Sequence, residues 1–148
     1  MKLSQSLELA IHALWYVAMQ RPGVQVQVKT VARLQNVKLS YLAKIFQELG
    51  KTGLVLGSRG KSGGYRLARP PAEISLGDVV RALGEDQPLL ECLPARGCKA
   101  TPGCPVEQVF QRARSRLMEE LDTVTLYDLV RRTQGHVTPE AIPWLGIS

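Results

Sequence analysis

Three cysteines are the residues of this sequence whose chemistry is most specific. Cys92, Cys98 and Cys104 are the only cysteines among 148 residues, and five residues separate each from the next. Prolines and glycines surround them, which is typical of a loop. Evenly spaced thiolates on a loop can wrap one soft metal centre. Structural zinc sites prefer two to four residues between paired cysteines, so zinc is disfavoured but remains an alternative, as do simple unpaired thiols.

A carboxylate and an imidazole near the N-terminus are candidates to complete such a site, because three thiolates leave a ligand missing. Glu8 and His12 are four residues apart, so a helix would place both on one face. The alternative for His12 is a structural histidine at the edge of the core.

Basic residues gather in the first half of the chain. Residues 1–70 contain eleven Lys and Arg against two Glu, a net charge of +9, whereas residues 71–148 carry −3. A basic half favours a polyanionic partner such as nucleic acid, and a solvated basic surface is the alternative.

The elements that must position these residues are helices and one hairpin. Two short β-prone runs around residues 54–56 and 65–67 flank a glycine-rich basic tip and predict the hairpin. Apolar side chains at helical spacing predict helices over about 6–20 and 29–34, from Leu39, Ser75 and Pro105 onward, and over 125–130. A tight turn is expected at 35–37, and Ser75 and Asp78 suggest a capping box.

Two short helices, a tight turn and a basic hairpin predict a winged helix-turn-helix, a mainly α fold with a small β-hairpin. The second helix of such a pair enters the major groove of DNA, and a basic hairpin can approach the duplex closely where glycines shape it. Hydroxyl and ammonium groups suit contacts to phosphates and base edges. The candidate DNA-binding residues are Lys38, Ser40, Tyr41 and Lys44 on the second helix and Arg59, Lys61, Gly63 and Gly64 on the hairpin.

In combination, these motifs resemble the Rrf-two family of bacterial winged-helix regulators, from Met1 to about Arg132. The resemblance rests on Ser40-Tyr41-Leu42, Gly53-Leu54-Val55, Gly63-Gly64-Tyr65 and the segment 74–80, together with a cysteine loop before a long helix. It implies a homodimer, joined through the long helix, that binds a palindromic operator in double-stranded DNA. Repression is the expected direction of regulation.

Iron–sulfur members of that family imply a cofactor. In them the cysteine loop of one subunit holds the cluster. In the nitric-oxide and redox sensors an acid matching Glu8 reaches it from the other subunit, joined in the redox sensors by a His matching His12. The family's cluster regulator has a ligating His where this chain has Glu107. The remaining arrangements are a four-iron (4Fe-4S) cluster on three cysteines and Glu8, or a two-iron (2Fe-2S) cluster. The two-iron cluster would use Cys92 and Cys104 with Glu8 and His12, or all three cysteines with His12, and is favoured.

The sequence therefore predicts a homodimeric transcriptional regulator controlled by an iron–sulfur cluster that senses redox state, nitric oxide or iron status. The alternatives are the same fold sensing by thiol chemistry or zinc, and more remotely a small metalloenzyme or electron carrier. We find no catalytic motif, signal peptide or run of 18 apolar residues, so we expect no enzyme activity, no small-molecule substrate, no membrane association and a cytoplasmic location. The predicted divisions are a DNA-binding domain (1–83), a cluster-binding loop (84–105), a dimerisation helix with a short C-terminal helix (106–132) and a loosely held tail (133–148).

Overall fold

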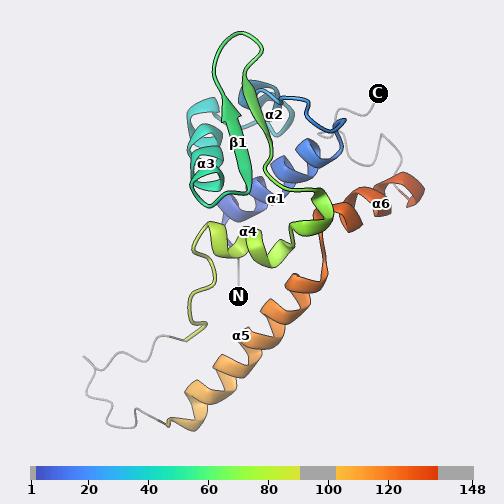
Figure 1. The fold of residues 1–148 in the computed structure, drawn as a ribbon. Coiled ribbons are helices and arrows are strands. Elements are labelled where there is room, and N and C mark those ends of the chain that lie inside the picture. The colour runs from blue at the N-terminus through green and yellow to red at the C-terminus, as the bar shows by residue number, and fades with distance from the viewer. Residues whose placement is uncertain (1–2, 91–102, 137–148) are drawn as a thin grey trace.

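The computed structural model describes residues 3–90 and 103–136, which form a mainly helical molecule with one antiparallel hairpin (Figure 1). This arrangement confirms the predicted fold class. In chain order the elements are α1 (Gln5–Ala18), α2 (Val28–Leu34), α3 (Leu39–Lys51), β1 (Val55–Ser58), β2 (Gly64–Leu67), the 3-10 helix η1 (Pro71–Glu73), α4 (Leu76–Ala82), α5 (Pro105–Thr123) and α6 (Leu126–His136). Cys92, Cys98 and residues 137–148 of the predicted tail (133–148) lie outside the described residues, whereas residues 133–136 belong to the last helix.

Side-chain caps fix where three of the helices begin, namely α1, α4 and α6, the last through Thr125 and Asp128. Ser4 Oγ accepts a hydrogen bond from the Leu7 N–H at 3.1 Å at the start of α1. At the start of α4, Ser75 and Asp78 each accept the other's backbone N–H at 3.0 Å, which is the capping box expected there. Such caps satisfy backbone donors that the first turn of a helix leaves without partners.

The core lies where α1, α3 and α4 meet the base of the hairpin. Leu7, Leu14 and Phe46 are completely buried there, and the Phe46 ring lies 4.9 Å from the ring of Tyr65 on β2. Val26, before α2, exchanges two backbone hydrogen bonds of 2.8 Å with Tyr65. This bridge fixes the hairpin to the helical pair, so the wing has a defined position beside α2 and α3.

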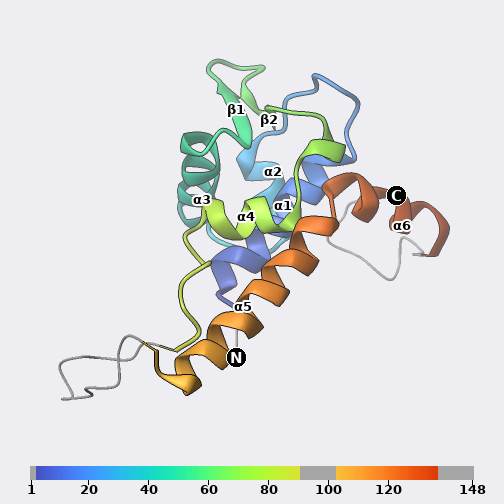
Figure 2. The same cartoon turned by 60° about the horizontal axis from the view of Figure 1, so that its bottom comes forward.

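Helix α5 differs from the other α-helices because none of its residues is buried. Its 19 residues span about 28 Å. Met118 and Leu121, in its second half, pack against the core, whereas its first turn lies far from the winged helix in both views (Figures 1 and 2). The first half of α5 therefore projects from the body of the molecule.

The helix ends differ from the expected ones where capping and tertiary contacts override periodicity. Helix α1 ends at Ala18, two residues before the expected end, and α6 continues to His136, beyond the expected residue 130. The apolar pattern does not predict η1, which a proline begins. Among the described residues, no helix is both long and apolar enough to cross a membrane.

Candidate nucleic-acid interface and cluster site

The first turn of α3 presents the predicted DNA-binding residues to solvent. Lys38 is at the N-cap position without a side-chain capping hydrogen bond, and Ser40, Tyr41 and Lys44 are all exposed. The opposite face of α3 is buried through Leu42, Ile45, Phe46 and Leu49. Burial of that row anchors the helix and leaves its polar face available for a groove of DNA.

Tyr41 has a partner outside its own helix. Its hydroxyl lies 2.7 Å from Ser6 Oγ of α1, and 37% of the residue remains exposed. Glu8 and His12 are on the same helix as Ser6. The candidate ligand helix and the candidate recognition helix are therefore joined by a side-chain hydrogen bond.

Gln47 is a candidate DNA-binding residue that our sequence analysis missed. It is exposed, and it follows Lys44 by three residues and Ser40 by seven, so the three share the outward face of α3. A glutamine amide can pair with both polar atoms of an adenine edge. The seven-residue spacing from Ser40 was the signal in the sequence that would have identified it.

The wing carries two of its three basic residues at the tip, and the third, Arg66, is on β2. Strands β1 and β2 pair from Val55 opposite Leu67 to Ser58 opposite Gly64, so the connecting residues 59–63 form the turn. Arg59 and Lys61 are exposed there. Gln27, just before α2, donates from Nε2 to the Lys61 carbonyl oxygen at 3.3 Å, which ties the tip to the helical pair.

Gly63 and Gly64 shape the wing. A Cβ on Gly63 would lie 2.5 Å from the Ser58 carbonyl oxygen, and one on Gly64 would lie 2.7 Å from the Val26 carbonyl carbon. Gly64 also has a φ of 153°, which side-chain-bearing residues rarely adopt. Both positions require glycine for close backbone packing, whether or not their backbone also touches DNA.

The candidate metal ligands lie in two separate parts of the described chain. Glu8 is exposed and His12 is half-buried on α1, whereas Cys104 is half-buried immediately before α5. Within residues 3–90 and 103–136, no three His, Cys, Asp or Glu side chains gather closely enough to hold a metal ion. Glu8 and His12 on α1 therefore do not form a metal site together with Cys104 among those residues.

The His12 imidazole is in a suitable form for metal binding. Partial burial lowers its pKa from 6.5, and the opposing effect of the Glu8 charge does not cancel that shift. The ring is therefore neutral near pH 7, as a metal ligand must be. Thiolate, imidazole and carboxylate groups together fit the donor set of an iron–sulfur site better than that of a magnesium or calcium site.

The described residues also fix the entry to the cysteine loop. Arg114 of α5 donates from Nε to the Asp86 carbonyl oxygen at 2.6 Å, and its Nη2 lies 3.5 Å from Asp86 Oδ2. The segment after α4 is thus held against α5, before the part of the loop that contains Cys92 and Cys98.

Comparison with known proteins identifies the family. The model of the Rrf2 (Rrf-two) family, described as an iron-dependent transcriptional regulator, matches residues 3–132. Among solved structures, CymR of B. subtilis, described as its global cysteine regulator, is 28% identical with a TM-score of 0.74, over 90% of this chain and 98% of that one. IscR of T. potens is 26% identical with a TM-score of 0.72, over 93% of each chain. The oxidised form of S. aureus CymR is 26% identical with a TM-score of 0.72, over 93% of this chain and 99% of that one.

These matches agree with the exposed polar face of α3 and with the basic wing. Because the family match covers most of the sequence, it identifies the whole described fold rather than one motif. The chain belongs to the Rrf2 family of DNA-binding transcriptional regulators, which are not enzymes.

Proposed function

We propose that this regulator is a homodimer that represses transcription from a palindromic operator, and that an iron–sulfur cluster shared between two copies controls its operator affinity. The observation that supports a shared site most directly is that the candidate ligands lie apart. Glu8 and His12 are on α1, whereas Cys104 precedes the projecting end of α5. We propose that a second chain brings the two sets together. The family description as iron-dependent supports the identity of the metal.

The surface for a second chain is the apolar side of α5. Val106, Val109 and Phe110 are 54%, 52% and 41% exposed, although they lie on one stripe of the helix. Val109 and Ala113, with Arg112 and Arg116, line a hollow of about 380 Å³. An apolar stripe that stays exposed on the projecting half of a helix is suited to packing against another helix.

The ligands of the proposed cluster come from both copies. The cysteine loop, residues 84–105, provides Cys92, Cys98 and Cys104, and α1 of the other copy provides Glu8 and His12. A two-iron cluster would take Glu8 and His12 with two of the cysteines, or His12 with all three, whereas a four-iron cluster would take Glu8 with all three cysteines. When bound, the cluster supplies a centre that can be oxidised, reduced or lost. Within the chain, the Ser6–Tyr41 hydrogen bond connects the ligand helix to the recognition helix.

Binding to DNA is assigned to two groups of residues. Helix α3 would enter the major groove with its outward polar side chains, and the wing would follow the phosphate backbone. The proposed contacts are Lys38, Ser40, Tyr41, Lys44 and Gln47 from α3 and Arg59, Lys61, Gly63 and Gly64 from the wing. Because each copy of a dimer occupies one half-site, any change in the distance between the two α3 helices changes operator affinity.

An anaerobic comparison of cluster-loaded and cluster-free protein tests this function. We expect broad visible absorption with bound iron and sulfide, and about a tenfold difference in operator affinity between the two forms, a typical coupling between sites. A Cys104→Ser variant, matched in size, should lack the absorption and bind DNA like the cluster-free form. Equal affinity of the loaded and unloaded protein would contradict the proposed control by a cluster.

A second candidate is the same regulator sensing through its thiols or through zinc. The observation that favours it is the similarity to CymR, which is described as a cysteine regulator. Zinc and bare thiols give no broad visible absorption. Anaerobic protein that is colourless, free of iron and sulfide, and responsive to a thiol oxidant would therefore favour this candidate.

A further inference from the structure

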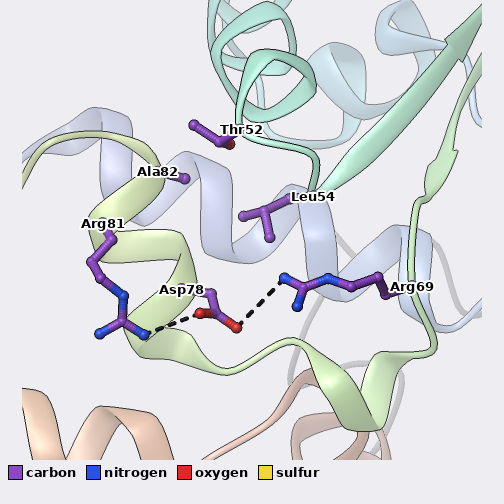
Figure 3. A pocket seen from close by; sticks show the side chains of 6 residues that line it. All are labelled: Thr52, Leu54, Arg69, Asp78, Arg81 and Ala82. Carbon is purple, nitrogen blue, oxygen red and sulfur yellow. Dashed lines mark hydrogen bonds and ion pairs between the residues drawn. The ribbon is translucent and has the colours of Figure 1, made fainter.

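Four charged residues form a continuous row from the exit of the wing to α5. Arg69, after β2, lies 3.7 Å from Asp78 Oδ2 of α4, and Asp78 Oδ1 lies 3.0 Å from Arg81 Nη2 (Figure 3). The same Nη2 lies 2.7 Å from Asp122 Oδ1 of α5, and Arg81 Nη1 lies 3.2 Å from Asp122 Oδ2. Arg81 and Asp122 therefore make a bidentate pair between two helices, which we call the α4–α5 clamp.

The clamp lies at the junction where α5 joins the winged helix. The backbone N–H of Leu76 donates to the Val124 carbonyl oxygen at 2.8 Å, and that of Leu126 donates to Ile74 at 2.9 Å. Gly77 faces the Asp122 carboxylate, and a Cβ at Gly77 would collide with it. Glycine at this position therefore lets the carboxylate lie directly against α4.

The clamp adds little to the stability of the fold, but its geometry can fix the orientation of α5 relative to α4. The Arg81 and Asp122 side chains are 43% and 44% exposed, and exposed ion pairs add little stability because water screens them. Two parallel hydrogen bonds between planar groups, however, fix orientation as well as distance. Hydrogen bonding from Arg81 holds the Asp122 pKa below its ordinary value, so the carboxylate stays charged near neutral pH.

A small change in the angle between α4 and α5 would displace the far end of α5 by several ångströms. A rotation of α5 by about 10° at this junction would move its other end by about 5 Å, because the helix is about 28 Å long. In a dimer joined through α5, the same rotation would move each recognition helix relative to its half-site. Half-sites are separated by about 34–36 Å, so operator binding is sensitive to such movements.

We propose that the Arg81–Asp122 clamp sets the angle between α5 and the winged helix, and so determines which half-site spacing the dimer accepts. This rests on the proposed homodimer but not on the cluster. Arg81 and Asp122 are thereby positioning residues for DNA binding, although neither is among the proposed DNA contacts. Arg69 and Asp78 extend the clamp to the exit of the wing.

The test measures spacing preference rather than affinity alone. An operator is first selected from random DNA with the wild-type protein, and its half-site spacing is then changed by one or two base pairs. The wild type should lose about tenfold or more in affinity for each change. Asp122→Asn and Arg81→Lys should lose less than about threefold for one base pair, while remaining dimeric. Asp86→Asn, which weakens a different ion pair of α5 with Arg114, should keep the wild-type preference.

Each result of the spacing experiment either supports or overturns the role proposed for the clamp. Uniformly weaker binding by the clamp variants with an unchanged spacing preference would overturn the proposal, because a merely stabilising pair lowers affinity at every spacing. Arg81→Lys keeps the charge and tests the bidentate geometry if Asp122→Asn does not fold. A monomeric wild type in sedimentation would instead contradict the homodimer, and thus separates failure of the proposed function from failure of the clamp.

Discussion

Arg59 and Lys61 place two positive charges at the tip of the wing, and Arg66 on β2 is a third basic residue of the hairpin. The affinity of a protein for DNA depends strongly on such charges, because each phosphate that is neutralised releases a counterion. The arginines of α5 carry the same charge but lie on the projecting helix, away from the wing. Position rather than total charge should therefore decide which basic residues contact the operator.

Removing one wing charge should weaken operator binding in a salt-dependent way. Arg59→Ala or Lys61→Ala should cost about 1 kcal/mol, or roughly fivefold in Kd, and lower the salt slope by about one. Arg112→Ala is the control, because Arg112, Arg114 and Arg116 are expected not to contact the duplex; since Arg112 also lines the hollow on α5, this variant is first checked to be dimeric. Titrations of the operator at several salt concentrations give both quantities, and an equal loss for Arg112→Ala would contradict the placement.

The α1 ligand pair distinguishes the two cluster types. Glu8→Ala should destabilise the cluster in either arrangement that uses this carboxylate, whereas His12→Ala should alter the visible spectrum and shorten the cluster lifetime only if two iron atoms are bound. Both should leave the fold intact, because neither residue is fully buried. Should His12→Ala have no effect on spectrum or lifetime, His12 is a structural residue and the four-iron arrangement with Glu8 is favoured.

The candidate DNA-binding residues could be identified from the sequence, but the side-chain contacts between distant residues could not. Lys38, Lys44 and Arg59 stood out because charge and helical spacing are local properties. The bond between Ser6 and Tyr41 joins residues 35 positions apart, and no local pattern predicts such a contact. The same limit applies to the Arg81–Asp122 clamp, whose members are 41 positions apart.

At the scale of elements, the wing depends on close backbone packing. Gly63→Ala should destabilise the protein by about 1–3 kcal/mol, because the new Cβ would meet backbone atoms that cannot move aside easily. Gly50→Ala is the matched control: its Cβ would have no neighbour nearer than 4.0 Å, and it lies in a helix, where alanine is favoured by up to about 1 kcal/mol. Denaturant unfolding measures both, and equal stabilities would contradict this role of Gly63.

Helix α5 depends on a partner for its apolar stripe. Phe110→Lys should weaken the dimer by at least about 2 kcal/mol, because an aromatic side chain in an interface is replaced by a charge. Ser115→Lys introduces the same charge at an exposed position on the opposite face of the helix, and should leave the dimer unchanged. Analytical ultracentrifugation compares the two, and a dimer that tolerates Phe110→Lys would argue against this interface.

The elements themselves were largely predictable because each has a local signal. The capping box at Ser75, the turn at 35–37, where Asn36 has a φ of 52°, and the start of α5 at Pro105 all occur where expected. The extra bridge between Val26 and Tyr65 was not predicted, because it pairs distant backbone segments. Equally, the apolar stripe of α5 predicts burial but not whether the partner is its own chain or another.

At the scale of the whole molecule, sensing and DNA binding are proposed to depend on two chains. The ligand helix α1 packs in the winged helix, and the cysteine loop leads into the helix proposed to join the dimer. A cluster between them would connect the body of one copy to the projecting helix of the other. Loss of the cluster would then release that connection and change the distance between the two recognition helices.

Mixed dimers test this shared site most directly. A Cys104→Ala chain and a Glu8→Ala/His12→Ala chain, carrying different affinity tags, are combined and the heterodimer is isolated anaerobically. Each homodimer should be colourless, since neither has a complete ligand set. The heterodimer should regain about half of the wild-type visible absorption, iron and sulfide, because one of its two sites combines an intact cysteine loop with an intact α1. A colourless heterodimer would contradict a cluster site shared between the two chains.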